Sequence, residues 1–163
     1  QLIKVLKMSI NLSKFSKPKL YESKPKFYFW YLVNIFLINN RLPLSSFKIF
    51  LLKLFGAKIG YGVIINSKIN IKFPWKLHVG NNCWIGSDVW IDNTEEVIIE
   101  NDCCISQGVY IVTGNHDFKK ESFDYYGKKV KIGSHSWIGA KSIICPGANI
   151  KKDSFVKIGS IIK

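Results

Sequence analysis

The chain has 163 residues, of which 47% are hydrophobic, and its formal net charge at pH 7 is +13. This length suits one domain with a short appendage, and the apolar share is ample for a hydrophobic core. The positive charge is concentrated in residues 1–58, which hold ten Lys, one Arg and one Glu, whereas residues 59–163 hold thirteen Lys and ten acidic residues. The aromatic side chains of the basic part are clustered in one apolar run instead of alternating with Lys, so we expect no nucleic-acid partner.

The apolar run spans Phe27 to Ile38, twelve residues interrupted only by Asn34. A helix that crosses a bilayer needs about 20 apolar residues, so this run is too short to cross a membrane. Two interpretations stay open. The run could form a helix that caps one end of the domain that follows. Flanked by Lys24, Lys26 and Arg41, it could also lie on a membrane surface.

A second helix is predicted from Ser46 to Phe55. Ser45 or Ser46 can cap its N-terminus, because a hydroxyl oxygen accepts a hydrogen bond from a free backbone N–H, and Gly56 can end it. Residues 1–58 are therefore predicted to be a basic, aromatic and helical N-terminal segment.

From Ile59 to the end of the chain, an aliphatic residue returns every six positions. A period of six fits neither a helix, at about 3.6 residues, nor a two-faced strand, at about 2 residues. It is typical of a β-solenoid, in which each hexad forms one short strand and three hexads complete a turn. The residues that carry this repeat are Ile59, Ile65, Ile71, Leu77, Val79, Ile85, Ile91, Val97, Ile99, Ile105, Ile111, Ile132, Ile138, Ile144, Ile150, Val156 and Ile162.

A second period, of twenty residues, supports the solenoid. Ile59, Val79 and Ile99 are twenty positions apart, and so are Cys83 and Cys103. Such residues should stack in successive turns, so that like side chains lie over one another. The alternative is an antiparallel sandwich, which does not require periods of six and twenty together. Residues 59–163 are therefore predicted to form an all-β parallel β-helix.

The six-residue repeat is interrupted between Ile111 and Ile132, where the chain has thirteen residues more than the repeat requires. They form a loop at about residues 113–131, and solenoids place functional residues on such insertions. His116 lies at the root of this loop. A neutral imidazole, with an ordinary pKa of about 6.5, can take a proton from a hydroxyl near neutral pH. The alternative is a ring that only holds the loop in place by hydrogen bonds.

The four cysteines, Cys83, Cys103, Cys104 and Cys145, form no C-x-x-C pair. Cys83 and Cys103 are interpreted as small core residues, and a disulfide between them is not required. No secretory signal is evident near the N-terminus. We therefore expect a reduced, cytoplasmic protein, and the apolar run adds the expectation of peripheral contact at the inner membrane face.

Six segments of the sequence carry a resemblance to a known family: residues 52–60, 74–77, 83–86, 104–108, 113–117 and 136–140. At these residues the chain resembles the hexapeptide-repeat acyltransferases, in particular the branch of colanic-acid-type exopolysaccharide O-acetyltransferases. The resemblance runs from about residue 50 to residue 163 and implies left-handed coils, acetyl-CoA as the acyl donor and no metal. Family members are typically homotrimers with each site between two subunits. His116 and the donor-binding strip are therefore expected to belong to different chains.

The resemblance also implies roles for individual residues. His116 matches the catalytic base of the family. Related galactoside-type enzymes place a substrate-binding Asn thirty residues before the base, and that position is Gly86 here. The residues expected to bind the acceptor are Asn115, Asp117, Asp92 and Asn93. The residues that match the strip for the pantetheine arm of CoA are Trp137, Gly139, Ala140, Lys157, Ile158, Gly159 and Ser160.

The sequence thus predicts an acetyl-CoA-dependent O-acetyltransferase, with His116 as general base, that acts on a sugar hydroxyl of a surface polysaccharide or its lipid-linked precursor. Transfer to the nitrogen of an amino sugar is one alternative. A β-helix that serves only as a scaffold or interaction module is another, and binding of acetyl-CoA would distinguish it. A zinc carbonic anhydrase on the same fold needs three His ligands. The three His of this chain are separated by 38 and 19 residues, which argues against that enzyme.

Overall fold

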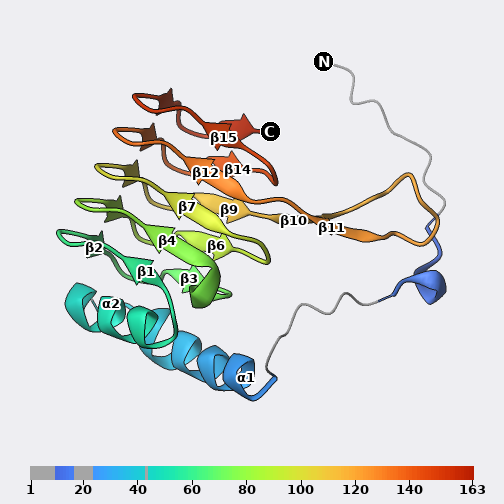
Figure 1. The fold of residues 1–163 in the computed structure, drawn as a ribbon, viewed down its shortest axis with the longest axis horizontal. Helices are drawn as coiled ribbons and strands as arrows, with labels where there is room; N and C mark the ends of the chain where they lie inside the picture. The colour runs from blue at the N-terminus through green and yellow to red at the C-terminus, as the bar shows by residue number, and fades with distance from the viewer. Residues whose placement is uncertain (1–9, 17–23, 43) are drawn as a thin grey trace.

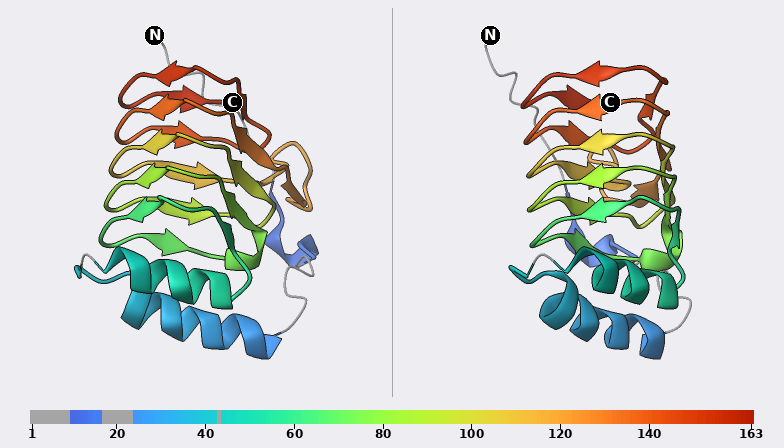
Figure 2. Two further views of the ribbon diagram at one scale, coloured as in Figure 1. Left: turned by 60° about the vertical axis from the view of Figure 1, so that its left-hand side comes forward. Right: turned by 90° about the vertical axis from the view of Figure 1, so that its left-hand side faces the viewer.

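The computed structural model describes residues 10–16, 24–42 and 44–163. In this part the chain winds into five stacked coils that form a three-sided prism, and two helices lie across the N-terminal end of the prism (Figures 1 and 2). The C-terminus lies at the opposite end (Figure 1). Among the described residues, no helix is long and apolar enough to pass through a bilayer.

Three parallel sheets, here called walls A, B and C, form the sides of the prism, and each coil contributes one short strand to each wall. Wall A consists of β1 (Lys58–Ile59), β4 (Leu77–Val79), β7 (Val97–Ile99), β12 (Val130–Ile132) and β15 (Asn149–Ile150). Wall B consists of β2 (Ile64–Ile65), β5 (Trp84–Ile85), β8 (Cys104–Ile105), β13 (Trp137–Ile138) and β16 (Phe155–Val156). Wall C consists of β3 (Asn70–Ile71), β6 (Trp90–Asp92), β9 (Tyr110–Val112), β14 (Ile143–Ile144) and β17 (Ile161–Ile162). The elements outside the walls are an antiparallel hairpin of β10 (Gly114–His116) and β11 (Tyr125–Gly127), and the short helix η3 (Pro74–Lys76).

The pairing of the strands confirms both periods. Ile59 pairs with Val79, and Val79 with Ile99, so residues twenty apart stack in neighbouring coils. Ile99 then pairs with Ile132, thirty-three residues later, which is twenty plus the thirteen extra residues. The aliphatic residues of the repeat point into the prism, where nearly all are buried, and their removal from water is the main stabilising term of the coils. The fold is the all-β, left-handed parallel β-helix that was expected.

The corners between the walls are tight, and the residue types at these positions explain how the chain turns there. Asn82 has a φ of 54°, a left-handed conformation that Asn tolerates better than most residues. At Gly86 the coils approach so closely that a Cβ would lie 2.6 Å from the backbone N of Gln107. Cys83 and Cys103, both free thiols, fill the inside of stacked corners and are only 1% and 2% exposed.

The N-terminal helices are η1 (Leu12–Lys14), α1 (Lys24–Val33), its continuation as one π-helical turn, η2 (Asn34–Ile38), and α2 (Ser45–Leu54). Trp30 is buried against the first coil, and its Nε1 donates a hydrogen bond to the carbonyl oxygen of Ile71 at 2.9 Å. From α2, the buried Nζ of Lys48 donates to the carbonyl oxygen of Asn66 at 3.1 Å. The two longer helices therefore cover the end of the first coil and satisfy backbone groups that no further coil would reach.

Helix α2 begins without the predicted serine cap. Its N-cap residue is Leu44, which makes no capping hydrogen bond, whereas the Oγ of Ser45 accepts a hydrogen bond from the backbone N of Ile65 at 2.9 Å. The prediction was wrong because the first coil, which no preceding coil covers on this side, competes for the same hydroxyl. Gly56 ends the helix as predicted, with a φ of +99°.

Candidate active site

The extra residues of the third coil form a hairpin that projects from the corner between walls C and A (Figure 1). His116 ends the first strand of this hairpin and pairs with Tyr125 of the second. The backbone N of Lys128 donates to the carbonyl oxygen of Thr113 at 2.8 Å, which closes the base of the hairpin. The sequence predicted a loop here. The antiparallel pairing holds the backbone of His116 more rigidly than an unpaired loop would.

The imidazole of His116 is held in one orientation. Its Nδ1 lies 2.8 Å from the carbonyl oxygen of Phe123, and because a carbonyl can only accept, this contact assigns the proton to Nδ1 and leaves the lone pair on Nε2. The ring stacks on that of Phe123, with centroids 4.4 Å apart and planes 5° apart. Tyr125 and Phe15 contact it at centroid distances of 5.7 Å and 5.3 Å. Nε2 is therefore positioned to accept a proton.

Phe15 reaches His116 because the segment of residues 10–16 lies along the hairpin. The backbone N of Asn11 donates to the carbonyl oxygen of Glu121 at 2.8 Å. The Nζ of Lys14 lies 2.8 Å from the Oε2 of the same glutamate. This contact links the N-terminal segment to the site, and nothing in the repeat pattern of the sequence indicated it.

A cavity of about 360 Å³ lies beside the imidazole. Its polar lining residues come from successive coils as well as from the hairpin: Lys72, Asp92, Thr94, Tyr110, Asn115, His116 and Tyr125. Phe15 lines it too. An apolar ring beside several hydrogen-bonding groups is a suitable environment for a sugar, which presents both hydroxyls and C–H faces.

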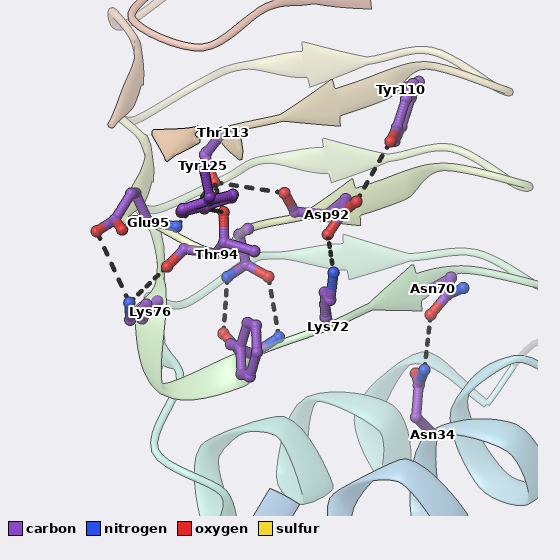
Figure 3. A network of polar contacts seen from close by, with 12 residues as sticks. Asn34, Asn70, Lys72, Lys76, Asp92, Thr94, Glu95, Tyr110, Thr113 and Tyr125 are labelled. Carbon is purple, nitrogen blue, oxygen red and sulfur yellow. Dashed lines mark hydrogen bonds and ion pairs between the residues drawn. The ribbon is translucent and has the colours of Figure 1, made fainter. Parts of the chain in front are cut away.

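Asp92 is the charged centre of this cavity (Figure 3). Its Oδ1 lies 2.8 Å from the Nζ of Lys72, and its Oδ2 accepts a hydrogen bond from the hydroxyl of Tyr110 at 3.3 Å. Burial, reinforced by the negative charge of Asp92, raises the pKa of Tyr110 to about 12, so this phenol stays protonated and donates to the carboxylate. Lys72 was not among the residues predicted from the sequence, although the twenty-residue period places it directly below Asp92.

A chain of hydroxyl groups joins the hairpin to the second coil (Figure 3). The hydroxyl of Tyr125 donates to the Oγ1 of Thr94. That oxygen lies 3.1 Å from the Oγ1 of Thr113, which in turn accepts a hydrogen bond from the backbone N of Glu95 at 2.8 Å. These contacts fix the root of the hairpin relative to the prism. Thr94 could not be predicted from the sequence, because a buried Thr at a corner has no distinguishing pattern.

The other residues expected to bind the acceptor have different environments. Asn115 lines the cavity, and its Oδ1 accepts from the backbone N of His116 at 2.8 Å. Asp117 does not line it; its Oδ1 accepts from the backbone N of Lys119 at 3.0 Å and stabilises the turn of the hairpin. Asn93 does not line it either: the side chain is 0% exposed.

The residues expected to bind the donor line a separate groove of about 520 Å³ at the corner between walls B and C. The members of the expected set that line it are Trp137, Gly139, Ala140, Lys157 and Ile158, whereas Gly159 and Ser160 follow on the same corner without lining it. A Cβ on Gly139 would lie 2.6 Å from the backbone N of Ile158, so only glycine fits there. The backbone N of Gly139 donates to the carbonyl oxygen of Val156 at 2.8 Å and is therefore committed to the wall.

One chain does not bring the imidazole and the groove together. His116 follows the end of β9, whereas Gly139 precedes the start of β14, so the two lie at opposite edges of wall C. At about 3.3 Å per residue, the three residues of β9 that separate the two edges span roughly 10 Å. Among the described residues, no three His, Cys, Asp or Glu side chains are grouped as a metal site would require.

Solved structures share this fold. A maltose O-acetyltransferase from Clostridium difficile 630 superposes with a TM-score of 0.77 at 22% identity, over 88% of this chain and 80% of that one. A galactoside acetyltransferase in complex with coenzyme A superposes with a TM-score of 0.75 at 20% identity, over 87% of this chain and 73% of that one. The prism thus has the fold of these β-helical acetyltransferases.

Similarity in sequence identifies the family of the chain, whereas similarity in structure identifies only its fold. A family profile described as the hexapeptide repeat of succinyl-transferase matches residues 76–112 and 129–163, on either side of the hairpin. A protein of Escherichia coli K12 named as a colanic acid biosynthesis acetyltransferase, WcaF, is 35% identical over 144 residues, which are 86% of this chain and 79% of that protein. The galactoside O-acetyltransferase of the same strain is 27% identical over 116 residues, or 69% of this chain and 57% of that protein. The chain therefore belongs to the hexapeptide-repeat acetyltransferases.

Proposed function

We propose that the protein transfers the acetyl group of acetyl-CoA to a hydroxyl of a sugar in a surface polysaccharide or its lipid-linked precursor. The observation that carries this proposal is the His116 imidazole, fixed by the carbonyl of Phe123 beside a polar cavity. Support for the substrate class comes from the name of WcaF, the relative that is 35% identical. Support for the donor comes from the galactoside acetyltransferase of the same fold that was solved with coenzyme A.

The proposed reaction is a direct acyl transfer. The Nε2 of His116 accepts the proton of the acceptor hydroxyl, and the oxygen attacks the thioester carbonyl carbon of acetyl-CoA. The tetrahedral intermediate then collapses, the C–S bond breaks, and the departing thiolate takes the proton from the imidazolium. The contact between Nδ1 and the carbonyl oxygen of Phe123 stabilises the protonated ring during this cycle. The negative oxygen of the intermediate needs a hydrogen-bond donor. Ala140 N–H is the candidate, because Gly139 N–H is already bonded to Val156.

The cavity suits a neutral hydroxyl better than a protonated amine. The carboxylate of Asp92 is paired with the ammonium of Lys72, so the pair has little net charge with which to attract a cation. Together the two groups can accept and donate hydrogen bonds, as can the amide of Asn115. We therefore place O-acetylation ahead of N-acylation of an amino sugar.

The separation of the two half-sites supports an active site between subunits. We propose a homotrimer in which the His116 cavity of one subunit faces the Trp137 groove of the next, because neither half-site contains both reacting groups. Two inactive variants, His116→Ala and Trp137→Ala, test this arrangement when they are unfolded and refolded together. In mixed trimers, about a quarter of the interfaces would combine an intact imidazole with an intact groove, and that share of activity should return. If both groups act within one chain, the mixture stays inactive.

The direct test of the reaction is His116→Ala. Release of the CoA thiol from acetyl-CoA is measured with galactosides, glucosides and amino sugars as acceptors. Loss of a general base should lower turnover by about 10²- to 10⁴-fold while the melting temperature stays close to that of the wild type. His135→Asn is the matched control: this histidine is exposed on a corner with a φ of 59°, which Asn tolerates, and activity should persist. Full turnover by His116→Ala would refute the proposed role, and absence of acetyl-CoA binding in calorimetry would favour a scaffold.

A further inference from the structure

The outward side of the N-terminal helices is apolar. Only a narrow stripe of α1 and η2, formed by Trp30, Asn34 and Ile38 at a spacing of four residues, is fully buried against the prism. The large apolar side chains that stay exposed, called the basal face here, are Tyr28, Phe29, Tyr31, Leu32, Ile35, Phe36 and Leu37 from α1 and η2 and Phe47, Phe50 and Leu54 from α2.

The basal face is larger than the scattered apolar residues that any surface contains. Both helices lie across the same end of the prism, so their outward sides form one surface (Figure 2). Its side chains are well exposed, for example Phe36 at 69% and Leu54 at 67%. A contiguous exposed apolar surface of this kind marks a site of interaction with another protein or a membrane.

The charges around the basal face favour a membrane over a protein partner. Residues 23–87 contain no Asp or Glu at all. Among the described residues from α1 to β1, by contrast, Lys26, Arg41, Lys53 and Lys58 are exposed cations. Lys53 lies within the outward stripe of α2, between Phe50 and Leu54. In the part of the helical segment that the structure describes, this apolar, aromatic surface has a basic rim and no carboxylate, which matches the interface of a bilayer that contains anionic lipids.

We propose that the basal face is a membrane-binding surface that lies in the headgroup region of an anionic bilayer. Neither helix is long enough to span the bilayer, so both would rest in its plane with their apolar side chains about 5–10 Å deep. The prism would then stand on the membrane, with its C-terminal coil outermost. The inference goes beyond acetyl transfer and does not depend on it.

This orientation would bring the acceptor cavity close to the lipid surface. The cavity is lined by Lys72 of the first coil, Asp92 of the second and Tyr110 of the third, so it begins at the level of the coil that the helices cover. Neighbouring coils are about 4.8 Å apart, which places the third coil only about 10 Å above the first. A sugar attached to a lipid headgroup could reach such a cavity without leaving the membrane.

The test is co-sedimentation of the full chain with vesicles of phosphatidylcholine and phosphatidylglycerol, with pure phosphatidylcholine as comparison. The wild type should bind the anionic vesicles more strongly. Leu32→Ser combined with Phe36→Ser should lower the partition coefficient by about 10- to 100-fold, since both side chains would leave the bilayer. Arg41→Glu combined with Lys53→Glu should abolish the preference for anionic vesicles. Ile161→Ser, an equally exposed apolar residue on the last coil, is the control and should bind like the wild type.

Three results would overturn the proposal: wild-type protein that stays in the supernatant, unchanged partition of the Leu32 and Phe36 double variant, or vesicle binding lost equally in Ile161→Ser. A fourth result would also overturn it: in sedimentation velocity without vesicles, the Leu32 and Phe36 double variant forms a smaller assembly than the wild type. The basal face would then be an interface between two copies of the chain and not a membrane-binding surface. Acetyl transfer to a soluble sugar should be unaffected in all these variants. Loss of lipid binding and failure of the proposed reaction are therefore separate outcomes.

Discussion

Replacement of Asn93 by Ala should destabilise the protein without changing its affinity for the acceptor. The Oδ1 of Asn93 accepts a hydrogen bond from the backbone N of Phe73 at 2.9 Å, and its Nδ2 donates to the carbonyl oxygen of Phe73 at 2.7 Å. Both bonds are buried, and together they join the corners of the first and second coils. A hydrogen bond contributes about 1 kcal/mol net, and a buried group that loses its partner costs about 1–3 kcal/mol. The two losses should thus total about 3 kcal/mol.

For a protein of this size, about 3 kcal/mol corresponds to a decrease of about 6–12 °C in melting temperature, which circular dichroism can follow. The Michaelis constant for the acceptor, measured well below the transition, should stay within about threefold of the wild type, because the side chain does not line the cavity. Asn115→Ala is the matched control: this exposed Asn should change the melting temperature by about 1–2 °C at most. An unchanged melting temperature in Asn93→Ala, or a tenfold higher acceptor Michaelis constant, would show that Asn93 binds substrate after all.

Three further predictions follow from contacts near the site and between the coils. Phe15→Ala removes a ring that packs on His116 and lines the cavity, so the acceptor Michaelis constant should rise several-fold while acetyl-CoA binding in calorimetry is unchanged. Gly139→Ala should abolish acetyl-CoA binding and lower the melting temperature, because its Cβ would meet the neighbouring coil at 2.6 Å. The hydrogen bond from Lys131, together with those from the backbone N and hydroxyl of Ser134, lowers the pKa of Glu100. The carboxylate therefore stabilises the fold above its unfolded pKa, and this stabilisation is lost as the pH falls through the folded pKa. Glu100→Gln should therefore melt about 2–4 °C lower at pH 7, and the two melting curves should converge near pH 3.

The prism could be predicted from the sequence because its geometry is imposed at every hexad. Ile85 and Ile105 show the reason. Both point into the prism, which gives the period of six, and they stack on one another in neighbouring coils, which gives the period of twenty. The two periods therefore predict the same structure. The hairpin could be located for the same reason, as the interval in which the repeat stops. Its antiparallel pairing could not be predicted, because residues 114–127 carry neither period.

The site was only partly predictable, because its contacts join elements that are unrelated in the repeat. His116 could be named from its place at the end of β9, yet the carbonyl that orients it belongs to Phe123, on the returning side of the hairpin. Asn93 was predicted as a candidate ligand because an Asn beside Asp92 looks the same in a sequence whether its amide faces a cavity or, as in the structure, the backbone of Phe73. Only the three-dimensional packing of the first corner against the second shows that the amide bonds to the backbone and does not face the cavity.

The distribution of the two half-sites along the prism has a consequence for how substrate preference is set. The proposed acceptor cavity draws on Lys72, Asp92 and Tyr110 in the first three coils and on the hairpin. Gly139 and Ile158 of the proposed donor groove belong to the last two coils, and Gln107 of the third coil also lines that groove. In a solenoid each coil contacts only its neighbours, so a substitution in the first coil does not reach the fourth. The hairpin also leaves the strand pairing of wall A uninterrupted, because Ile99 pairs directly with Ile132 across its base. Changes at positions 72 and 92 and in the hairpin can therefore alter the acceptor while the same acyl donor is used.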